Sequence, residues 1–237
     1  MFIHGKNTKV YYDEYDFTQY FDQATVQMNA DTAETSVFGK NSKEYIPGLK
    51  DATLALEGFF DGSANAVDEE FFAILGGAGN LFSVYPPGDT VGNAGYAMKA
   101  IETAYGTLPT TDSAVRTSMA AQADGTAAER VLSMHALGAE SASDWTGTAS
   151  DNSAASTTGG SAYLHVTAAT GTIEVKLEHS TDNFSADTTD LATFTAVTAA
   201  TAERITFTGA VKQYVRGFAT IAGGETITFQ LGFHRAV

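Results

Sequence analysis

The sequence contains no cysteine and few basic residues: 13 Lys and Arg stand against 28 Asp and Glu, so the formal net charge of the 237 residues is −15. The lack of cysteine excludes disulfide frameworks, cysteine nucleophiles and zinc sites with thiolate ligands. The shortage of Lys and Arg argues against the basic surface of a nucleic-acid-binding protein and against a polybasic membrane contact. Charged residues make up only 17% of the chain, so Thr, Ser, Gly, Asn and Gln must supply much of the polar surface.

Long hydrophobic runs are also missing. The longest apolar stretch is Phe71–Tyr85, where glycines, Asn80 and Ser83 interrupt 15 residues. A bilayer-spanning helix needs roughly 20 apolar residues, so we expect no membrane anchor. Met1–Asp13 lacks the apolar segment of a secretory signal. Hydrophobic residues still account for 43% of the chain, which is enough to build the core of one large domain or two small ones.

A change in composition suggests two domains. Residues 1–136 carry 18 acidic and 8 basic residues, and residues 137–237 carry 10 and 5, so the net charges are −10 and −5. Between them, residues 138–160 are small and polar, as in a linker or a long surface loop. The lone Trp145 in this stretch indicates that the segment is fixed in place rather than free. The sequence therefore predicts domains at 1–136 and 137–237.

The first half predicts strands and one helix. Thr53–Phe60 alternates, with Leu54, Leu56 and Phe60 on one face, which is the pattern of a half-buried strand. A helix should follow, capped by Asn65, with a stripe of Val67, Phe71, Ile74 and Leu75 and a stop at Gly76-Gly77. Further strands are expected at 10–21, 24–38, 80–85, 96–105, 113–123 and 131–137.

The second half predicts β-structure throughout. Residues 151–237 hold 17 Thr in 87 positions, which favours strands over helices. Six short strands separated by turns indicate an antiparallel sandwich or a jelly-roll-like domain. The expected strands are Tyr163–Thr167, Ile173–His179, Leu191–Val197, Ile205–Thr208, Val211–Ile221 and Thr226–Phe233.

No pattern in the sequence predicts catalysis or a cofactor. The five histidines do not sit at metal-ligand spacing from one another, and there is no GxSxG motif. His179-Ser180-Thr181-Asp182 puts catalytic residue types side by side, but catalytic triads are assembled from distant segments. We interpret this tetrad as a strand end with a polar turn. The chain is not expected to be an enzyme, and no catalytic, cofactor or metal residue is assigned.

For one short loop, the sequence does not decide whether it binds a metal ion. Asp182, Asp187 and Asp190 offer carboxylates to Ca²⁺, but their spacing does not match the EF-hand loop. An acidic loop on a β-protein is more often simply solvated.

The most specific signal is an ordered set of motifs. Asp31–Gly39 reads DTAETSVFG, Tyr45–Asp51 reads YIPGLKD, and the alternating strand Thr53–Phe60 follows. This order resembles the tail-tube (major tail) proteins of long-tailed, non-contractile bacteriophages, with Thr35-Ser36 in place of the more usual Thr-Thr pair. AAQADG at Ala120–Gly125 resembles the same domain. HSTDN at 179–183 and TFTAVTAATAERITFTG at 193–209 resemble a domain attached to such proteins.

The resemblance implies a fold and a role. It implies a mainly β chain: a tail-tube-type β-sandwich with one flanking helix, followed by a second small antiparallel β domain on the outside. Six copies would form a ring, and stacked rings would form the tube of the virion tail, assembled in the host cytoplasm. Other copies and other tail proteins are the implied partners, and DNA would pass through the lumen without specific binding. An acidic or neutral wall suits this role because it repels phosphate.

Two sets of residues are candidates for assembly. The polar loop before the IPGL turn corresponds to the inter-ring loop of the family and contains Lys40, Asn41, Ser42, Lys43 and Glu44. The polar face of the following strand, with Thr53, Ala55 and Glu57, is the candidate lumen wall, although the same face would also suit a contact with a neighbouring subunit.

Two other kinds of protein are alternative interpretations of the sequence. A capsid decoration protein or a tail terminator would share the β-fold and the acidity, but the order of motifs in 31–60 favours the tube. A carbohydrate-binding β module would suit a jelly-roll-like second half, but the aromatic residues lie mostly in the first half.

Overall fold

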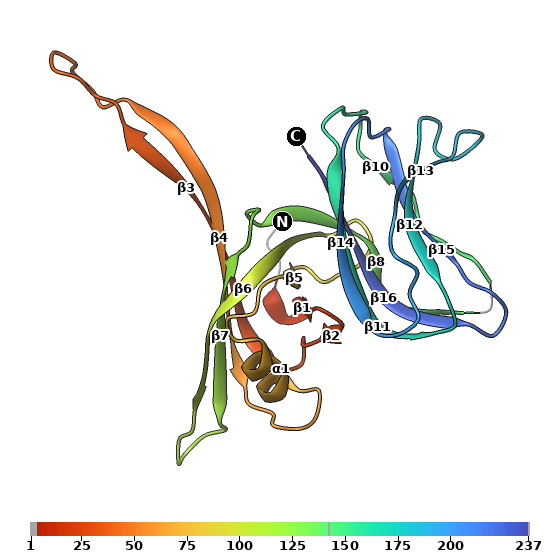
Figure 1. Cartoon of the computed structure of the whole chain (residues 1–237), viewed down its shortest axis with the longest axis horizontal. Coiled ribbons are helices and arrows are strands. Elements are labelled where there is room, and N and C mark those ends of the chain that lie inside the picture. Colours follow the sequence, from red (N-terminus) through yellow and green to blue (C-terminus); the bar gives the residue numbers. More distant parts are fainter. Residues whose placement is uncertain (1–3, 142, 237) are drawn as a thin grey trace. The chain divides into compact units, whose positions relative to one another are not determined.

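The structure is a computed structural model, and it describes residues 4–141 and 143–236. It is mainly β, and its paired strands are antiparallel (Figure 1). The chain forms two compact units. Unit 1 comprises Met1–Gln19, Leu81–Ala97 and Arg130–Val237, and unit 2 comprises Tyr20–Asn80 and Met98–Glu129. The mainly β fold predicted from the sequence is confirmed.

Unit 2 is built on a four-stranded antiparallel arrangement. β3 (Phe21–Glu34) pairs with β4 (Tyr45–Phe59), β4 with β7 (Arg116–Ala123), and β7 with β6 (Ala94–Leu108). The first residues of β6 belong to unit 1 and the rest to unit 2. The predicted alternation of Thr53–Phe60 is confirmed at Leu54 and Leu56, which are buried and face the helix side of the sheet.

Helix α1 (Val67–Ile74) covers the buried face of unit 2. Its Phe71 ring lies 6.0 Å from the ring of Phe21 and 6.3 Å from that of Tyr105, centroid to centroid. The predicted burial of Phe60 is wrong, since this side chain is 38% exposed. The reason is that β4 ends at Phe59, so the period of two no longer governs the next residue.

The predicted cap of α1 is also wrong. The residue at the N-cap position is Ala66, which makes no side-chain cap bond, and Asn65 lies in the left-handed region with φ 58°. Instead, the carboxylate of Glu69 accepts a hydrogen bond from the Asn65 N–H at 2.7 Å. The predicted stop is confirmed, because Gly76 takes φ 80°, where glycine carries no steric penalty. Leu75 is half exposed, so it does not belong to the buried stripe that the sequence predicted.

The strands of unit 1 belong to two sheets, and the first of them includes β6, most of which lies in unit 2. The first has the strand order β14-β11-β16-β8-β6-β5-β1-β2, and the second has the order β10-β15-β12-β13 with β9 beside β15. A short 3-10 turn at Gly5–Asn7 precedes β1. The strands not yet bounded are β1 (Lys9–Tyr12), β2 (Tyr15–Asp16), β5 (Asn80–Tyr85), β8 (Glu129–Ser141), β9 (Trp145–Thr146), β10 (Ser150–Asp151), β11 (Gly160–Thr170), β12 (Glu174–Ser180), β13 (Thr189–Thr193), β14 (Thr201–Phe207), β15 (Tyr214–Thr220) and β16 (Thr226–Arg235).

The core of unit 1 fills the space between these two sheets. Leu164 and Phe229 from the first sheet pack in one cluster with Val175, Leu177 and Val215 from the second, and all five are fully buried. Each strand contributes alternate residues, as the sequence predicted for Ile173–His179 and Thr226–Phe233. The antiparallel sandwich expected in the second half is therefore present.

Strand β11 is buried on both faces. Leu164 faces the sandwich core, while Tyr163 joins a second cluster with Tyr11, Tyr85 and Val131. The predicted domain boundary at residue 137 falls inside β8, which pairs with β16 from Leu132 to Ser141. The linker-like stretch 138–160 contains the end of β8 together with β9 and β10. The division into 1–136 and 137–237 stays a prediction about which part folds by itself.

Among the described residues, no helix is long and apolar enough to cross a membrane.

Candidate assembly surfaces

The β3–β4 pair continues as a two-stranded ribbon beyond the rest of the sheet (Figure 1). β7 pairs with β4 only from Thr53 to Phe59, so β3 is the only strand that pairs with Tyr45–Ala52 in the described part of the chain. This part of the ribbon has no buried side chain before Ala52, and it exposes large apolar groups. The exposed apolar side chains of the ribbon and its loop are Met28, Val37, Phe38, Tyr45, Ile46 and Leu49.

The connecting loop 35–44 is closed by its own polar groups. The N–H of Thr35 donates to the carbonyl of Glu44 at 2.8 Å, and the N–H of Glu44 donates to Ser36 Oγ at 3.0 Å. Lys40 pairs with Glu44 at 2.8 Å, and Lys43 pairs with Glu34 at 2.9 Å. All four charged side chains are largely exposed, so these pairs contribute little to stability.

The structure thus places the predicted loop residues, Lys40 to Glu44, at the end of the ribbon. The same loop also carries an exposed apolar residue, Phe38, which no pattern in the sequence had singled out as an assembly residue. Its side chain is fully exposed, with Val37 beside it at 64% exposure. The FG pair at positions 38–39 was visible only as part of a motif, because nothing in its spacing indicated exposure.

The predicted lumen residues share one face of the four-stranded sheet. Ala55 and Glu57 are exposed, and Thr53 is half buried. Cross-strand partners on β3 and β7 extend this face with small or uncharged polar side chains, because residues opposite each other point to the same side. These partners are Gln23, Thr25, Gln27, Ser118, Ala120 and Gln122.

Few charges interrupt this polar face. Arg116 of β7 forms a bidentate pair with Asp22, at 2.9 and 2.7 Å, and its guanidinium lies 5.1 Å from the centre of the Phe59 ring. Arg116 and its hydrogen bonds lower the pKa of Asp22 from its ordinary value. The cation on this face is therefore neutralised by its neighbour, and Glu57 adds a negative charge.

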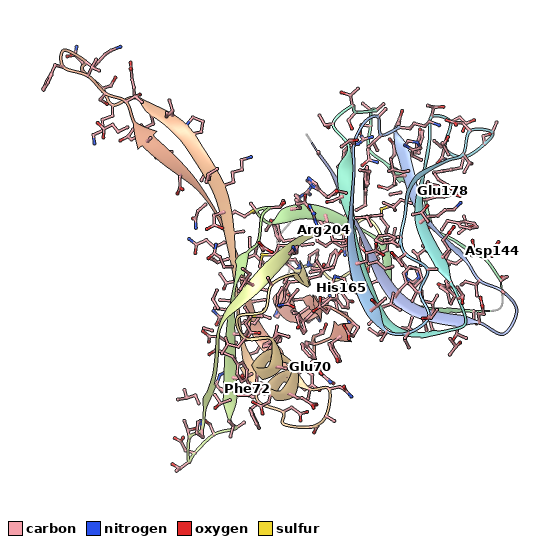
Figure 2. The ribbon with its side chains drawn as sticks, in the orientation of Figure 1. Glu70, Phe72, Asp144, His165, Glu178 and Arg204 are labelled. Carbon is pink, nitrogen blue, oxygen red and sulfur yellow. The ribbon has the colours of Figure 1, made fainter. Side chains whose placement is uncertain are left out.

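A groove runs between α1 and the second half of β6. Phe72 and Leu75 of the helix expose 72% and 50% of their surface beside Tyr105, Gly106 and Thr107 of the strand. Asp68 lines the same groove and accepts a hydrogen bond from the Tyr105 hydroxyl at 2.8 Å. Glu69 also lines it. Phe72, labelled in Figure 2, lies outside the predicted stripe of α1 and was missed for that reason.

Unit 2 also buries a carboxyl group. The side chain of Glu102 is fully buried opposite Ala121, and neither of its oxygens has a hydrogen-bond partner. Burial raises the pKa of Glu102 to about 8, because the charged form loses its water. At neutral pH this group is mostly the neutral acid.

Unit 1 buries a histidine that connects distant segments. Nδ1 of His165 lies 2.7 Å from the carbonyl oxygen of Asp13, and Nε2 lies 2.8 Å from Ser83 Oγ. A carbonyl can only accept, so Nδ1 carries the proton and Nε2 accepts from the serine. Burial lowers the pKa of His165, which is labelled in Figure 2, to about 4. Its ring stacks on that of Tyr11, with 5.7 Å between the ring centroids.

The predicted polar turn after β12 is confirmed. Ser180 Oγ bonds to Asp182 at 2.8 Å, whereas His179 Nδ1 accepts from the Lys212 N–H at 3.3 Å, so the tetrad is not a triad. Asp182 accepts backbone N–H groups of its own loop, such as that of Ala186 at 2.9 Å.

The remaining acids of this loop pair with lysines. Asp187 contacts Lys212 at 2.6 Å, and Asp190 contacts Lys176 at 2.8 Å. Within the described residues, no group of three His, Cys, Asp or Glu side chains is placed to hold a metal.

No protein-family model and no curated protein matches the chain. Among solved structures, similar chains come from the virion of a native gene transfer agent particle, with 16% identity, a TM-score of 0.42 and coverage of 52% of this chain and 95% of that one. The cap that terminates the anti-feeding prophage tube matches at 17% identity and a TM-score of 0.45, covering 56% and 92%. The Dit protein of SPP1, a hub of the adsorption apparatus in phages that infect Gram-positive bacteria, matches at 8% and 0.41, covering 97% and 99%. These structural neighbours are components of phage and phage-like tails and tubes.

Proposed function

We propose that the chain is a structural subunit of a phage tail tube, in which hexameric rings of this protein stack to form the conduit for the genome. The observation that carries the proposal is the β3–β4 ribbon. Its far end bears the motifs of Asp31–Gly39 and Tyr45–Asp51, and it exposes apolar side chains without a third strand. Two-stranded ribbons are marginally stable alone, so this element is suited to be completed by a neighbouring subunit.

The polar face of the sheet in unit 2 is the proposed lumen wall, with Thr53, Ala55 and Glu57 facing the channel. Its support is chemical: apart from Glu57, the residues in register with these three on β3 and β7 are small or uncharged, and the arginine of this face is paired with Asp22. Contacts to phosphate need several free cations on one face. DNA would therefore slide past this wall without being held.

Other features of the proposal follow from the family resemblance. The second domain predicted from the sequence, residues 137–237, lies outside the tube, and the tube ends bind other tail proteins. The subunit belongs to the virion tail and is assembled in the host cytoplasm. Its role is structural, and it needs no cofactor.

The test is electron microscopy of the purified chain. Wild-type protein should form rings or tubes, and deletion of Lys40–Glu44 should leave a folded, soluble subunit that does not polymerise. A matched control replaces Thr110, Thr111 and Ser113 in the exposed β6–β7 turn with glycine and should still polymerise. Wild-type protein that stays monomeric under all assembly conditions would refute the tube, and a deletion variant that forms full-length tubes would remove the loop from the mechanism.

A further inference from the structure

The groove between α1 and β6 is an apolar surface with an acidic rim. Phe72 and Leu75 provide the apolar part, and Asp68 and Glu69 lie along the same groove. Among the described residues, no Lys or Arg lines this groove, and the nearest one on β6, Lys99, is paired with Asp124. A partner that fits this groove would combine an exposed apolar side chain with flanking positive charge.

The end of the β3–β4 ribbon has this combination. Phe38 and Val37 are exposed at 108% and 64%, and Lys40 and Lys43 follow within a few residues. Lys40 is paired with Glu44 of the loop and Lys43 with Glu34 at the end of β3, but both pairs are exposed. Exposed pairs contribute little to stability, so the lysines can exchange partners at little cost.

A chain cannot dock its own ribbon end on its own groove. Phe71 of α1 contacts Phe21, which stands at one end of β3, while the loop follows Glu34 at the other end. At roughly 3.3 Å per residue, the length of β3 separates the two sites by about 40 Å. The occupant of the groove is therefore another copy of the chain.

We propose that the groove between α1 and β6 binds the Val37-Phe38 end of the ribbon of a second copy. Phe38 packs between Phe72 and Leu75, and Lys40 and Lys43 approach Asp68 and Glu69. This contact joins two different surfaces, so it is repeated from copy to copy rather than closing as a dimer. This proposal rests on the proposed tube, and it identifies the surface of the neighbouring ring to which the loop binds.

The absence of cysteine makes a direct test simple. One preparation carries Phe38→Cys and another carries Phe72→Cys, and both are co-assembled with excess wild-type chain so that tubes form. A short bis-maleimide should then link the two variants into a covalent dimer. The matched control pairs Phe38→Cys with Ala55→Cys, an exposed position on a different face of unit 2, and should give no dimer. A second pair, Val37→Cys with Ala73→Cys, repeats the test at neighbouring positions.

The outcomes separate the two proposals. Tubes in which both thiol pairs fail to link, or in which the Ala55 control links equally well, overturn the groove while leaving the tube intact. If wild-type chain forms no tubes, the proposed function itself fails. As a second measurement, Phe72→Ser should raise the protein concentration at which tubes appear, and unchanged assembly of this variant would also count against the groove.

Discussion

Replacing Glu102 with glutamine should stabilise the protein at neutral and alkaline pH. Glu102 lies in the buried face of the sheet in unit 2, opposite Ala121, with no hydrogen-bond partner for either oxygen. Glutamine has nearly the same size and also stays without a partner. The substitution therefore removes mainly the cost of ionisation, and the packing changes little.

The size of the effect follows from the two pKa values. The pKa of Glu102 is about 8 in the folded chain, against an ordinary value of 4.5. Between these values the folded state binds more protons than the unfolded state, so the free energy of unfolding falls as pH rises. At pH 7 the loss is roughly 3 kcal/mol, and near pH 5 it is less than about 1 kcal/mol. The glutamine variant should gain these amounts over wild type.

Urea titrations at pH 5, 7 and 8, followed by circular dichroism, test this expectation. Hydrogen exchange in peptides from β4 and β7 locates the change in unit 2, while fluorescence of Trp145 reports unit 1 and should not differ between the proteins. Glu57→Gln is the matched control, because that carboxylate is exposed on β4 of the same sheet, with β7 between it and β6. A glutamine variant that gains the same stability at pH 5 and pH 8, or that is less stable at pH 7, would refute the reasoning.

Three further predictions follow from features described above. Leu56→Ala should cost about 2–5 kcal/mol in denaturant titration, because the side chain is fully buried, and a loss below about 1 kcal/mol would contradict the packing of β4. Acid should weaken unit 1. The pKa of His165 is lowered to about 4, so roughly 3 kcal/mol should be lost between pH 6.5 and 4, read from Trp145 fluorescence, and His165→Gln should flatten this dependence. Glu57→Lys should leave tube assembly intact and slow genome delivery, whereas loss of rings would place Glu57 at a subunit contact.

Local patterns predicted most strands because alternation and turn residues are local properties. Leu54 and Leu56, the helix near Val67–Leu75 and the alternating strands of the second half were all found in this way. The length of the β3–β4 ribbon was not predictable, because its outer residues are polar or exposed and show no period of two. The cap of α1 failed for a related reason: Asn65 has the right chemistry, but its backbone adopts a left-handed turn.

The surfaces were harder to predict than the fold. The loop Lys40–Glu44 was predicted from a family-like motif, and its part in assembly stays a prediction. Phe72 was missed because only the residues that face the core follow the helical spacing. The burial of Glu102 was also invisible, since a carboxylate in a strand of mixed polarity normally faces water. The boundary at residue 137 was drawn from composition, which does not register that Tyr163 packs with Tyr11 and Tyr85 from distant parts of the chain.

If the subunits stack as proposed, the exposed ribbon has a consequence for the kinetics of assembly. In a free subunit its outer half gains hydrogen bonds but almost no buried apolar area, so holding it in one conformation costs conformational entropy. Two free subunits that meet must order two such ribbons for a single contact, whereas a subunit that joins a growing end meets ribbons already held in place. Polymerisation should therefore begin after a lag, and a small amount of preformed tube should abolish that lag.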